Sequence, residues 1–112
     1  MSMKKIFVVK EVEVNCEGAH LDDTEITNEV YCYGSKEKAE ECLKDLYKEK
    51  VMEALGYDLD DADDLKAYED DKENNGYLET DLTPTKAYLN MWSHIEGWNS
   101  YTLEITEENL ED

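Results

Sequence analysis

The sequence predicts an α+β fold, in which an antiparallel sheet of about four strands is packed by one long amphipathic helix. Two runs near the N-terminus and one near the C-terminus alternate apolar and polar residues with the two-residue period of strands. Between them, a 20-residue segment carries an apolar stripe at helical spacing. The length of 112 residues fits one domain, residues 1–112, and is too short for two ordinary ones.

The first strand is predicted over Ile6–Val14, where β-branched residues share one face on either side of Lys10: Ile6, Val8, Val12 and Val14. The second is predicted over Ile26–Tyr33, with its apolar positions at Ile26, Val30 and Cys32. The segment between them is rich in turn-forming residues. We therefore expect the two strands to pair antiparallel.

A long amphipathic helix is predicted over Lys36–Leu55, because apolar residues recur there at four-residue steps: Ala39, Leu43, Tyr47, Val51 and Leu55. Ser35 is a suitable N-cap, and Gly56 supplies the left-handed residue that commonly ends such a helix. The segment also holds five lysines and six acidic residues. Its charge is therefore nearly balanced.

The acidic segment, Tyr57–Asp81, holds eleven carboxylates against two lysines and interrupts this pattern within the domain. It carries about half of the chain's formal charge of −19. A short helix is predicted over Asp60–Glu69, capped by Asp60 and touching the domain through Leu65 and Tyr68. A loop is expected over Asp70–Gly76.

Residues 84–96 fit two alternatives. A helix would begin with Thr83 as its cap and Pro84 at the first position, whereas a strand would enter a hairpin that turns at Glu96 and Gly97. The aromatic and β-branched content favours the strand, with Trp92 facing Tyr101 and Tyr88 facing Ile105.

A last strand is predicted over Ser100–Thr106, and the acidic tail, residues 107–112, is expected to be frayed or peripheral. The expected order of elements is therefore β-β-α, a short α in the acidic segment, and then β-β.

Charge and composition limit the function. A net charge of −19 and the absence of arginine disfavour direct binding of nucleic acid or of an anionic membrane, and favour a basic protein surface. The sequence has no long apolar window and no signal-peptide pattern, so we expect a cytoplasmic protein.

Catalytic signatures are also missing from the sequence: it has no Gly-rich phosphate loop and no nucleophile elbow. Carboxylates are so plentiful that their presence carries no information about acid or base catalysis. We therefore expect a protein that is not an enzyme and has no cofactor, no catalytic residues and no dedicated metal site.

Calcium binding is a less favoured functional alternative. Asp71, Glu73, Asn75 and Gly76 occupy positions one, three, five and six of an EF-hand pattern. Position twelve is Leu82, where the motif needs a bidentate Glu. A Ca²⁺-responsive module would therefore lack a principal ligand.

The carboxylates of the acidic segment are spaced suitably to imitate nucleic-acid phosphates. Residues four apart on a helix lie about 6 Å from one another, which is comparable to the spacing of charges along a nucleic-acid strand. We expect a partner-binding surface formed by Asp58, Asp60, Asp61, Asp63, Asp64, Tyr68, Glu69, Asp70, Asp71 and Glu73. The alternative is that this segment only keeps the chain solvated.

Over most of its length the chain resembles the small, acidic, lysine-only proteins of bacteriophages and other bacterial mobile elements. The resemblance rests on the KKIFVV opening, the SKEKAEECLKDLYKE helix, the acidic middle and the YTLEI strand. Some of those proteins are anti-CRISPR or other anti-defence proteins, and several resemble DNA in their charge distribution. The resemblance implies an inhibitor of a basic, nucleic-acid-binding effector, such as a CRISPR-associated protein. A non-enzymatic interaction domain that forms a homodimer is the alternative.

Overall fold

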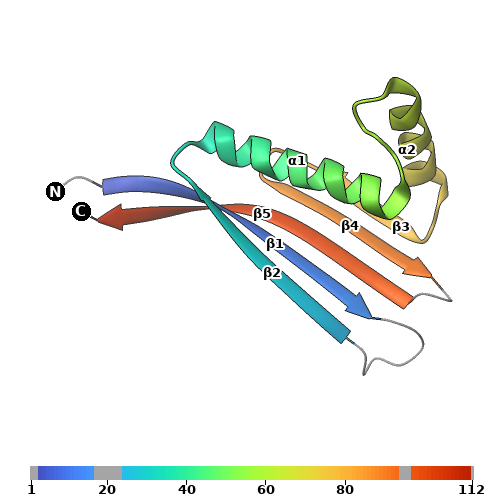
Figure 1. Ribbon diagram of the computed structural model, residues 1–112, viewed down its shortest axis with the longest axis horizontal. Coiled ribbons are helices and arrows are strands. Elements are labelled where there is room, and N and C mark those ends of the chain that lie inside the picture. The colour runs from blue at the N-terminus through green and yellow to red at the C-terminus, as the bar shows by residue number, and fades with distance from the viewer. Residues whose placement is uncertain (1–2, 17–23, 94–96, 112) are drawn as a thin grey trace.

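A five-stranded antiparallel sheet carries two helices on one of its faces (Figure 1). The computed structural model describes residues 3–16, 24–93 and 97–111. The strand order is β2-β1-β5-β4-β3. The elements in chain order are β1 (Met3–Cys16), β2 (Thr24–Tyr33), α1 (Lys36–Leu55), α2 (Ala62–Asn74), β3 (Leu78–Leu82), β4 (Lys86–Ser93) and β5 (Gly97–Glu111).

The predicted α+β class is confirmed, but the strand count and the order of elements were wrong. The observed order is β-β-α-α-β-β-β. The strand that was not predicted, β3, has leucine only at its two ends. Leu78 and Thr80 point inward and are 4% and 5% exposed. Pairing with β4 and packing against α2 therefore stabilise β3. Neither contact can be predicted from a sequence as short as LETDL.

Helix α1 has the predicted bounds and both of the predicted caps. The backbone N–H of Lys38 donates to Ser35 Oγ at 3.4 Å, and Gly56, with φ of 77°, donates its N–H to the Met52 carbonyl at 2.9 Å. The buried stripe of the helix packs on the centre of the sheet, against Val9, Leu89 and Leu103. These three side chains are fully buried, so the main core lies between α1 and strands β1, β5 and β4.

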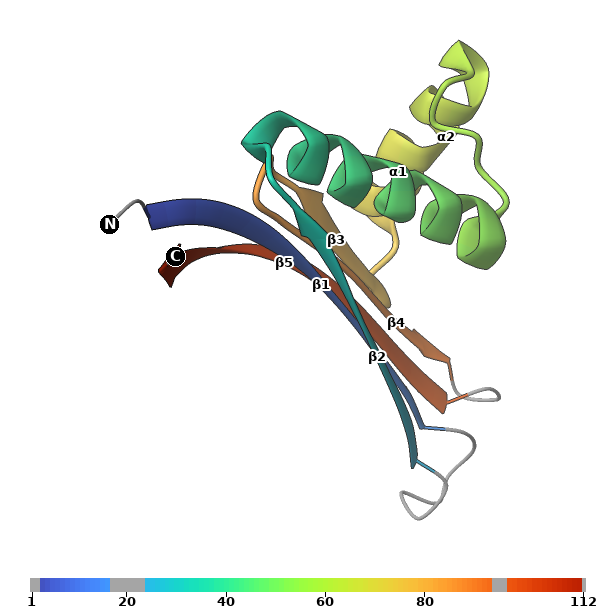
Figure 2. The same ribbon diagram turned by 60° about the vertical axis from the view of Figure 1, so that its left-hand side comes forward.

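The β-branched residues predicted to share one face of the first strand do so, but that face points away from the helices. The helices cover the face that carries Phe7 and Val9 (Figure 2). Because side chains alternate along a strand, Ile6, Val8, Val12 and Val14 lie on the opposite side. We call this side, as far as the structure describes it, the open face. The exposed Ile26 and Val30 of β2 also lie on it.

Strands β1 and β5 are longer than predicted because they pair with each other along nearly their whole length. The register joins Met3 to Glu111 and Cys16 to Trp98. Residues 107–111 are therefore part of β5, and the expectation of a frayed tail was wrong for them.

The favoured strand in residues 84–96 is confirmed as β4, but its predicted register was wrong. Trp92 faces Trp98 and Tyr88 faces Thr102, whereas Tyr101 faces the buried Leu89. The core face of β4 thus holds its smaller residues, and its large aromatic residues point to the open face. Of the predicted turn, Glu96 lies outside the described residues.

Helix α2 begins after Asp61 and ends at Asn74, so the predicted cap, Asp60, was wrong, and of the predicted loop over Asp70–Gly76 only Asn75 and Gly76 lie outside the helix. Asp61 accepts hydrogen bonds from the backbone N–H groups of Asp63 and Asp64 at 2.8 and 3.3 Å. At the other end, the N–H of Asn75 donates to the Asp71 carbonyl at 2.8 Å. The helix therefore extends through most of the segment that resembled a loop.

A buried hydroxyl cluster, formed by Tyr47, Tyr68 and Thr80, attaches α2 to the rest of the fold. The hydroxyl of Tyr47 hydrogen-bonds with those of Tyr68 and Thr80. Thr80 in turn donates to the Tyr88 carbonyl at 2.8 Å. The cluster thus joins α1, α2, β3 and β4, and the ring of Tyr57 packs edge-on against that of Tyr68 with centroids 6.4 Å apart.

We expect Tyr68→Ala to release α2 while α1 stays packed on the sheet, because the substitution removes the buried anchor of the short helix. The loss should be about 4 kcal/mol of unfolding free energy, as for other buried aromatic truncations. Tyr68→Phe, the control, should lose only about 1 kcal/mol because it keeps the ring and removes one hydrogen-bonding group. Chemical denaturation measures both values. Amide hydrogen exchange of residues 62–74 should quicken in Tyr68→Ala alone, and unchanged exchange there would contradict the anchoring role.

Candidate partner-binding surface

Helix α2 lies at the β3 edge of the sheet, on the same face as α1, and rises away from the sheet (Figures 1 and 2). Residues 57–74, which include this helix and the turn before it, contain nine carboxylates and two lysines. By contrast, α1 contains six acidic residues and five lysines. Negative charge is therefore concentrated on the outlying helix, which is the candidate site.

Four of the predicted site residues organise the turn that precedes α2. Asp61 caps the helix, Asp64 accepts from the Asp58 N–H, and Asp58 accepts from the Asp60 N–H, the last two at 2.9 Å. Lys48 of α1 donates to Asp60 at 2.6 Å. The hydrogen bond and positive charge of Lys48 hold the pKa of the Asp60 carboxyl below its usual range. These carboxylates thus fix the start of α2 relative to α1.

The carboxylates best placed to meet a partner are the exposed ones of α2: Asp63, Glu69, Asp70 and Glu73. Asp71 is half-buried. Tyr68, which the sequence also placed on the partner surface, is only 4% exposed. Its position in the hydroxyl cluster makes it an anchor, and this corrects its predicted role. Leu65, predicted to touch the domain, is 40% exposed.

The spacing of charge along α2 matches that of a nucleic-acid strand in order of magnitude. Its 13 residues include six carboxylates and extend over about 20 Å at 1.5 Å per residue. One strand of B-DNA carries about six phosphates over the same axial distance, at 3.4 Å each. Helix α2 therefore carries a comparable number of charges per unit length, and the four exposed ones, Asp63, Glu69, Asp70 and Glu73, lie on one side of a backbone of fixed shape.

The EF-hand pattern does not form a calcium loop. Its first residues, from Asp71 to Asn74, form the last turn of α2, and its last residues belong to β3. The described residues contain no group of three or more His, Cys, Asp or Glu that could hold a metal ion. The segment therefore lacks the loop in which the ligands of an EF-hand converge.

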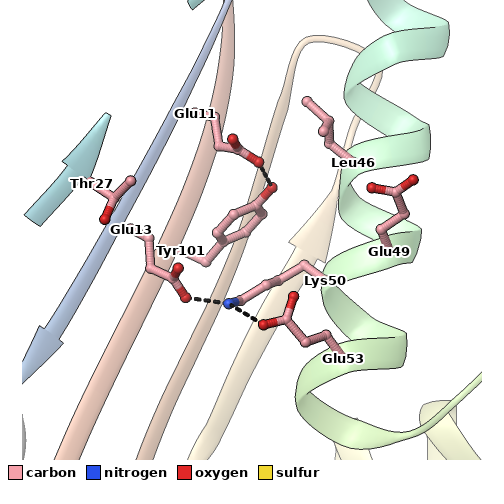
Figure 3. Close-up of a pocket in the computed structure, with 8 residues that line it drawn as sticks. All are labelled: Glu11, Glu13, Thr27, Leu46, Glu49, Lys50, Glu53 and Tyr101. Carbon is pink, nitrogen blue, oxygen red and sulfur yellow. Dashed lines mark hydrogen bonds and ion pairs between the residues drawn. The ribbon is translucent and has the colours of Figure 1, made fainter. Parts of the chain in front are cut away.

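A second acidic site, which the sequence did not predict, lies between α1 and the sheet (Figure 3). It is a pocket of about 120 Å³ lined by Glu11, Glu13, Thr27, Leu46, Glu49, Lys50, Glu53 and Tyr101. Glu11 and Glu13 of β1 point to the side of the sheet that the helices cover. The alternating pattern of the strand did not predict a function for them. Only the packing of α1 on β1 and β5 brings them to Lys50.

Lys50 is the central cation of this pocket, and only 10% of its side chain is exposed. Its Nζ pairs with Glu13, lies 3.9 Å from Glu53 and lies 5.2 Å from the centroid of the Tyr101 ring. Burial alone raises the pKa of Glu13, but hydrogen bonds from Lys50 and Asn99, with the charge of Lys50, outweigh burial and lower it. Lys50 thus neutralises the negative charge of Glu13 within the pocket.

On the other side of the pocket, two tyrosines donate hydrogen bonds to the carboxylate of Glu11. The hydroxyl of Tyr101 donates to Glu11, and that of Tyr31 donates to Glu11 at 3.3 Å and to Glu29 at 3.1 Å. Burial, followed by the hydrogen bonds and negative charge of these glutamates, raises the pKa of Tyr31 to about 12. The pKa of Tyr101 is raised for the same reasons, with burial the largest. Both tyrosines are therefore neutral donors at physiological pH.

Comparison with protein-family models, curated proteins and solved structures found no match to this chain. The candidate surface therefore has to be interpreted from its own chemistry. In the part of the chain that the structure describes, no helix has the length and apolarity required to cross a membrane.

We expect Glu13→Gln to lower the unfolding free energy by about 2 kcal/mol near neutral pH, because it removes a charged partner of the buried Lys50. The folded pKa of Glu13 lies below its ordinary value of 4.5, so its stabilising effect is complete above that pH. It is lost as the pH falls through the folded value. The difference between wild type and Glu13→Gln should therefore shrink in acid.

Urea denaturation of both proteins at about pH 7 and about pH 3.5 measures this difference. Glu53→Gln is the matched control, because Glu53 contacts the same lysine but its side chain is 77% exposed. It should change stability by less than about 0.5 kcal/mol. A loss in Glu13→Gln that is equal at both pH values would contradict the assignment.

Proposed function

We propose that this protein is a non-enzymatic, stoichiometric inhibitor of a basic, nucleic-acid-binding bacterial defence effector. In this proposal α2 occupies the channel or groove that otherwise holds the backbone of a nucleic acid. The observation that carries it is the concentration of six carboxylates along the outlying helix, beside a nearly neutral α1.

The attachment of α2 supports recognition by a defined surface. A solvating acidic loop would have to be ordered when it binds, and that ordering opposes binding. Here Asp61 caps the helix and the buried Tyr68 fixes its inner side, so the exposed carboxylates are already arranged. Their arrangement favours a partner with a linear row of lysine and arginine side chains.

CRISPR-associated effectors are the first partners to test, because the sequence resembles anti-defence proteins and these effectors hold a nucleic-acid duplex in a positively charged channel. A protein that competes for such a channel does not need a nucleotide site, a metal or a catalytic group. Its binding should weaken as salt screens the charges.

The test is competition with DNA. Purified, guide-loaded CRISPR effectors are mixed with fluorescent target DNA and increasing amounts of this protein, in about 50 mM and about 300 mM salt. We expect displacement of DNA from at least one effector at low salt and a loss of at least about tenfold in potency at high salt. Unchanged DNA binding throughout the panel at low salt would contradict inhibition of CRISPR effectors by this surface.

Two charge-neutralised variants locate the surface. One changes the exposed carboxylates of α2, as Asp63→Asn, Glu69→Gln, Asp70→Asn and Glu73→Gln. The other changes four exposed carboxylates of α1, as Glu37→Gln, Glu41→Gln, Asp45→Asn and Glu49→Gln. Each variant removes four charges from −19 and leaves −15, so net charge is matched. We expect a loss of at least about tenfold for the α2 variant only; equal losses would point to net charge instead of the position of α2.

A further inference from the structure

Strand β2 forms an exposed edge of the sheet (Figure 1). Its inner side pairs with β1 over ten residue pairs, from Phe7–Tyr33 to Cys16–Thr24. In the described part of the chain, β1 is its one strand neighbour, so the outer backbone groups of β2 face away from the sheet. All side chains from Glu25 to Val30 are exposed, including Ile26 and Val30 at 60% each.

The two edges of the sheet differ in the features that normally discourage further pairing. The β3 edge is only five residues long, carries Glu79 and Asp81, and lies beside α2. The β2 edge also carries two carboxylates, Glu25 and Glu29, but it is ten residues long, contains no lysine and no proline, and lies far from α2. Short length and cover are among the usual protections of an edge strand, and β2 has neither, so it has the character of a strand that pairs.

The charge of the chain limits which surface can meet a second copy, because two chains of −19 repel each other. The acidic helix α2 lies at the β3 edge, four strand spacings away from β2, or about 19 Å. Pairing through β2 would place the two acidic helices at opposite ends of the assembly. On the open face of β5, two strands from β2, Glu104 is flanked by Lys10 and Lys86, which balance its charge.

The sequence of β2 is complementary to itself in one particular register. A two-fold axis perpendicular to the sheet pairs two copies of β2 antiparallel, and facing residues then lie on the same face. With the axis at Asn28, Ile26 faces Val30 of the second copy. On the other face, Thr27 faces Glu29 and Glu25 faces Tyr31. No glutamate meets a glutamate, and residues 24–32 all take part.

The neighbouring registers fit less well. With the axis at Thr27, Glu25 of one copy faces Glu29 of the other, and with the axis at Glu29 the two copies of that residue face each other. Directly opposed like charges destabilise a strand pair. With the axis at Val30, the pairing would run into Gly34 and the start of α1, so fewer residues of the strand could pair.

We propose that β2 is a homodimer interface, in which two copies of this chain pair antiparallel about Asn28 and join their sheets into one. The backbone groups of the edge then find partners, and Ile26 of each copy packs against Val30 of the other, beside Val14 of its own chain. The dimer does not rest on the proposed inhibition, because it uses the edge opposite α2. Salt also separates the two: screening strengthens contact between acidic copies and weakens docking on a basic partner.

Light scattering coupled to gel filtration tests the dimer with the full chain at about 0.1 mM in about 300 mM salt. The expected mass is twice the 13.0 kDa of the chain. The double variant Ile26→Lys, Val30→Lys should halve it. Met52→Lys, Leu65→Lys is the matched control, because it replaces two other exposed apolar residues, and its mass should stay that of a dimer. A monomeric wild type, or a lysine edge variant that stays dimeric, would overturn the proposal.

Cross-linking tests the register. In a variant with Cys16, Cys32 and Cys42 replaced by serine or alanine, Asn28→Cys should form a disulfide-linked dimer on mild oxidation, because the two sulfurs face each other across the axis. Thr27→Cys is the control, since that position faces Glu29 and should cross-link at least about tenfold more slowly. Circular dichroism checks that both variants fold. Equal rates at the two positions would exclude pairing about Asn28.

Discussion

The packing of α1 on the sheet is the contact on which the rest of the structure depends. Leu43, Tyr47 and Val51 are at most 1% exposed, and they pack against β1, β5 and β4. Burial of these side chains stabilises the fold and selects the sheet face that becomes the core. Tyr47 also carries a hydroxyl group into this core, where Tyr68 and Thr80 satisfy it. One helix residue therefore sets the positions of α2 and β3 as well.

Polar groups lie inside this interface only where neighbouring elements satisfy them. The hydroxyl of Tyr47 and the ammonium group of Lys50 lie three residues apart on α1, and each meets partners from the sheet. An unpaired buried group of either kind would oppose folding. The two contacts differ in consequence, because the hydroxyl cluster holds α2 in place whereas the Lys50 pair neutralises part of an acidic pocket.

The molecule is asymmetric across the sheet in charge. Its densest negative charge lies on α2 beside β3, while exposed Ile26 and Val30 lie at the β2 edge. The two proposed partners, a basic protein and a second copy of the chain, would therefore bind at opposite edges of the sheet. Because electrostatic repulsion decreases with distance and with salt, assembly through β2 is compatible with an acidic helix that stays accessible. The two proposed interactions need not compete.

Patterns in the sequence were enough to predict the α+β class, the bounds and caps of α1, and the acidic composition of the candidate surface. Each depends on residues close together in the chain, through helical period, capping chemistry or charge. The sequence did not show that Ile6 and Val12 lie on the open face, because β1 is apolar on both sides over Ile6–Val9 and either side could have met the helix. Tertiary structure decided this, and it also created β3, turned Tyr68 inward and joined Glu13 to Lys50. These outcomes depend on contacts between distant segments, and local periodicity does not specify which partner covers a face.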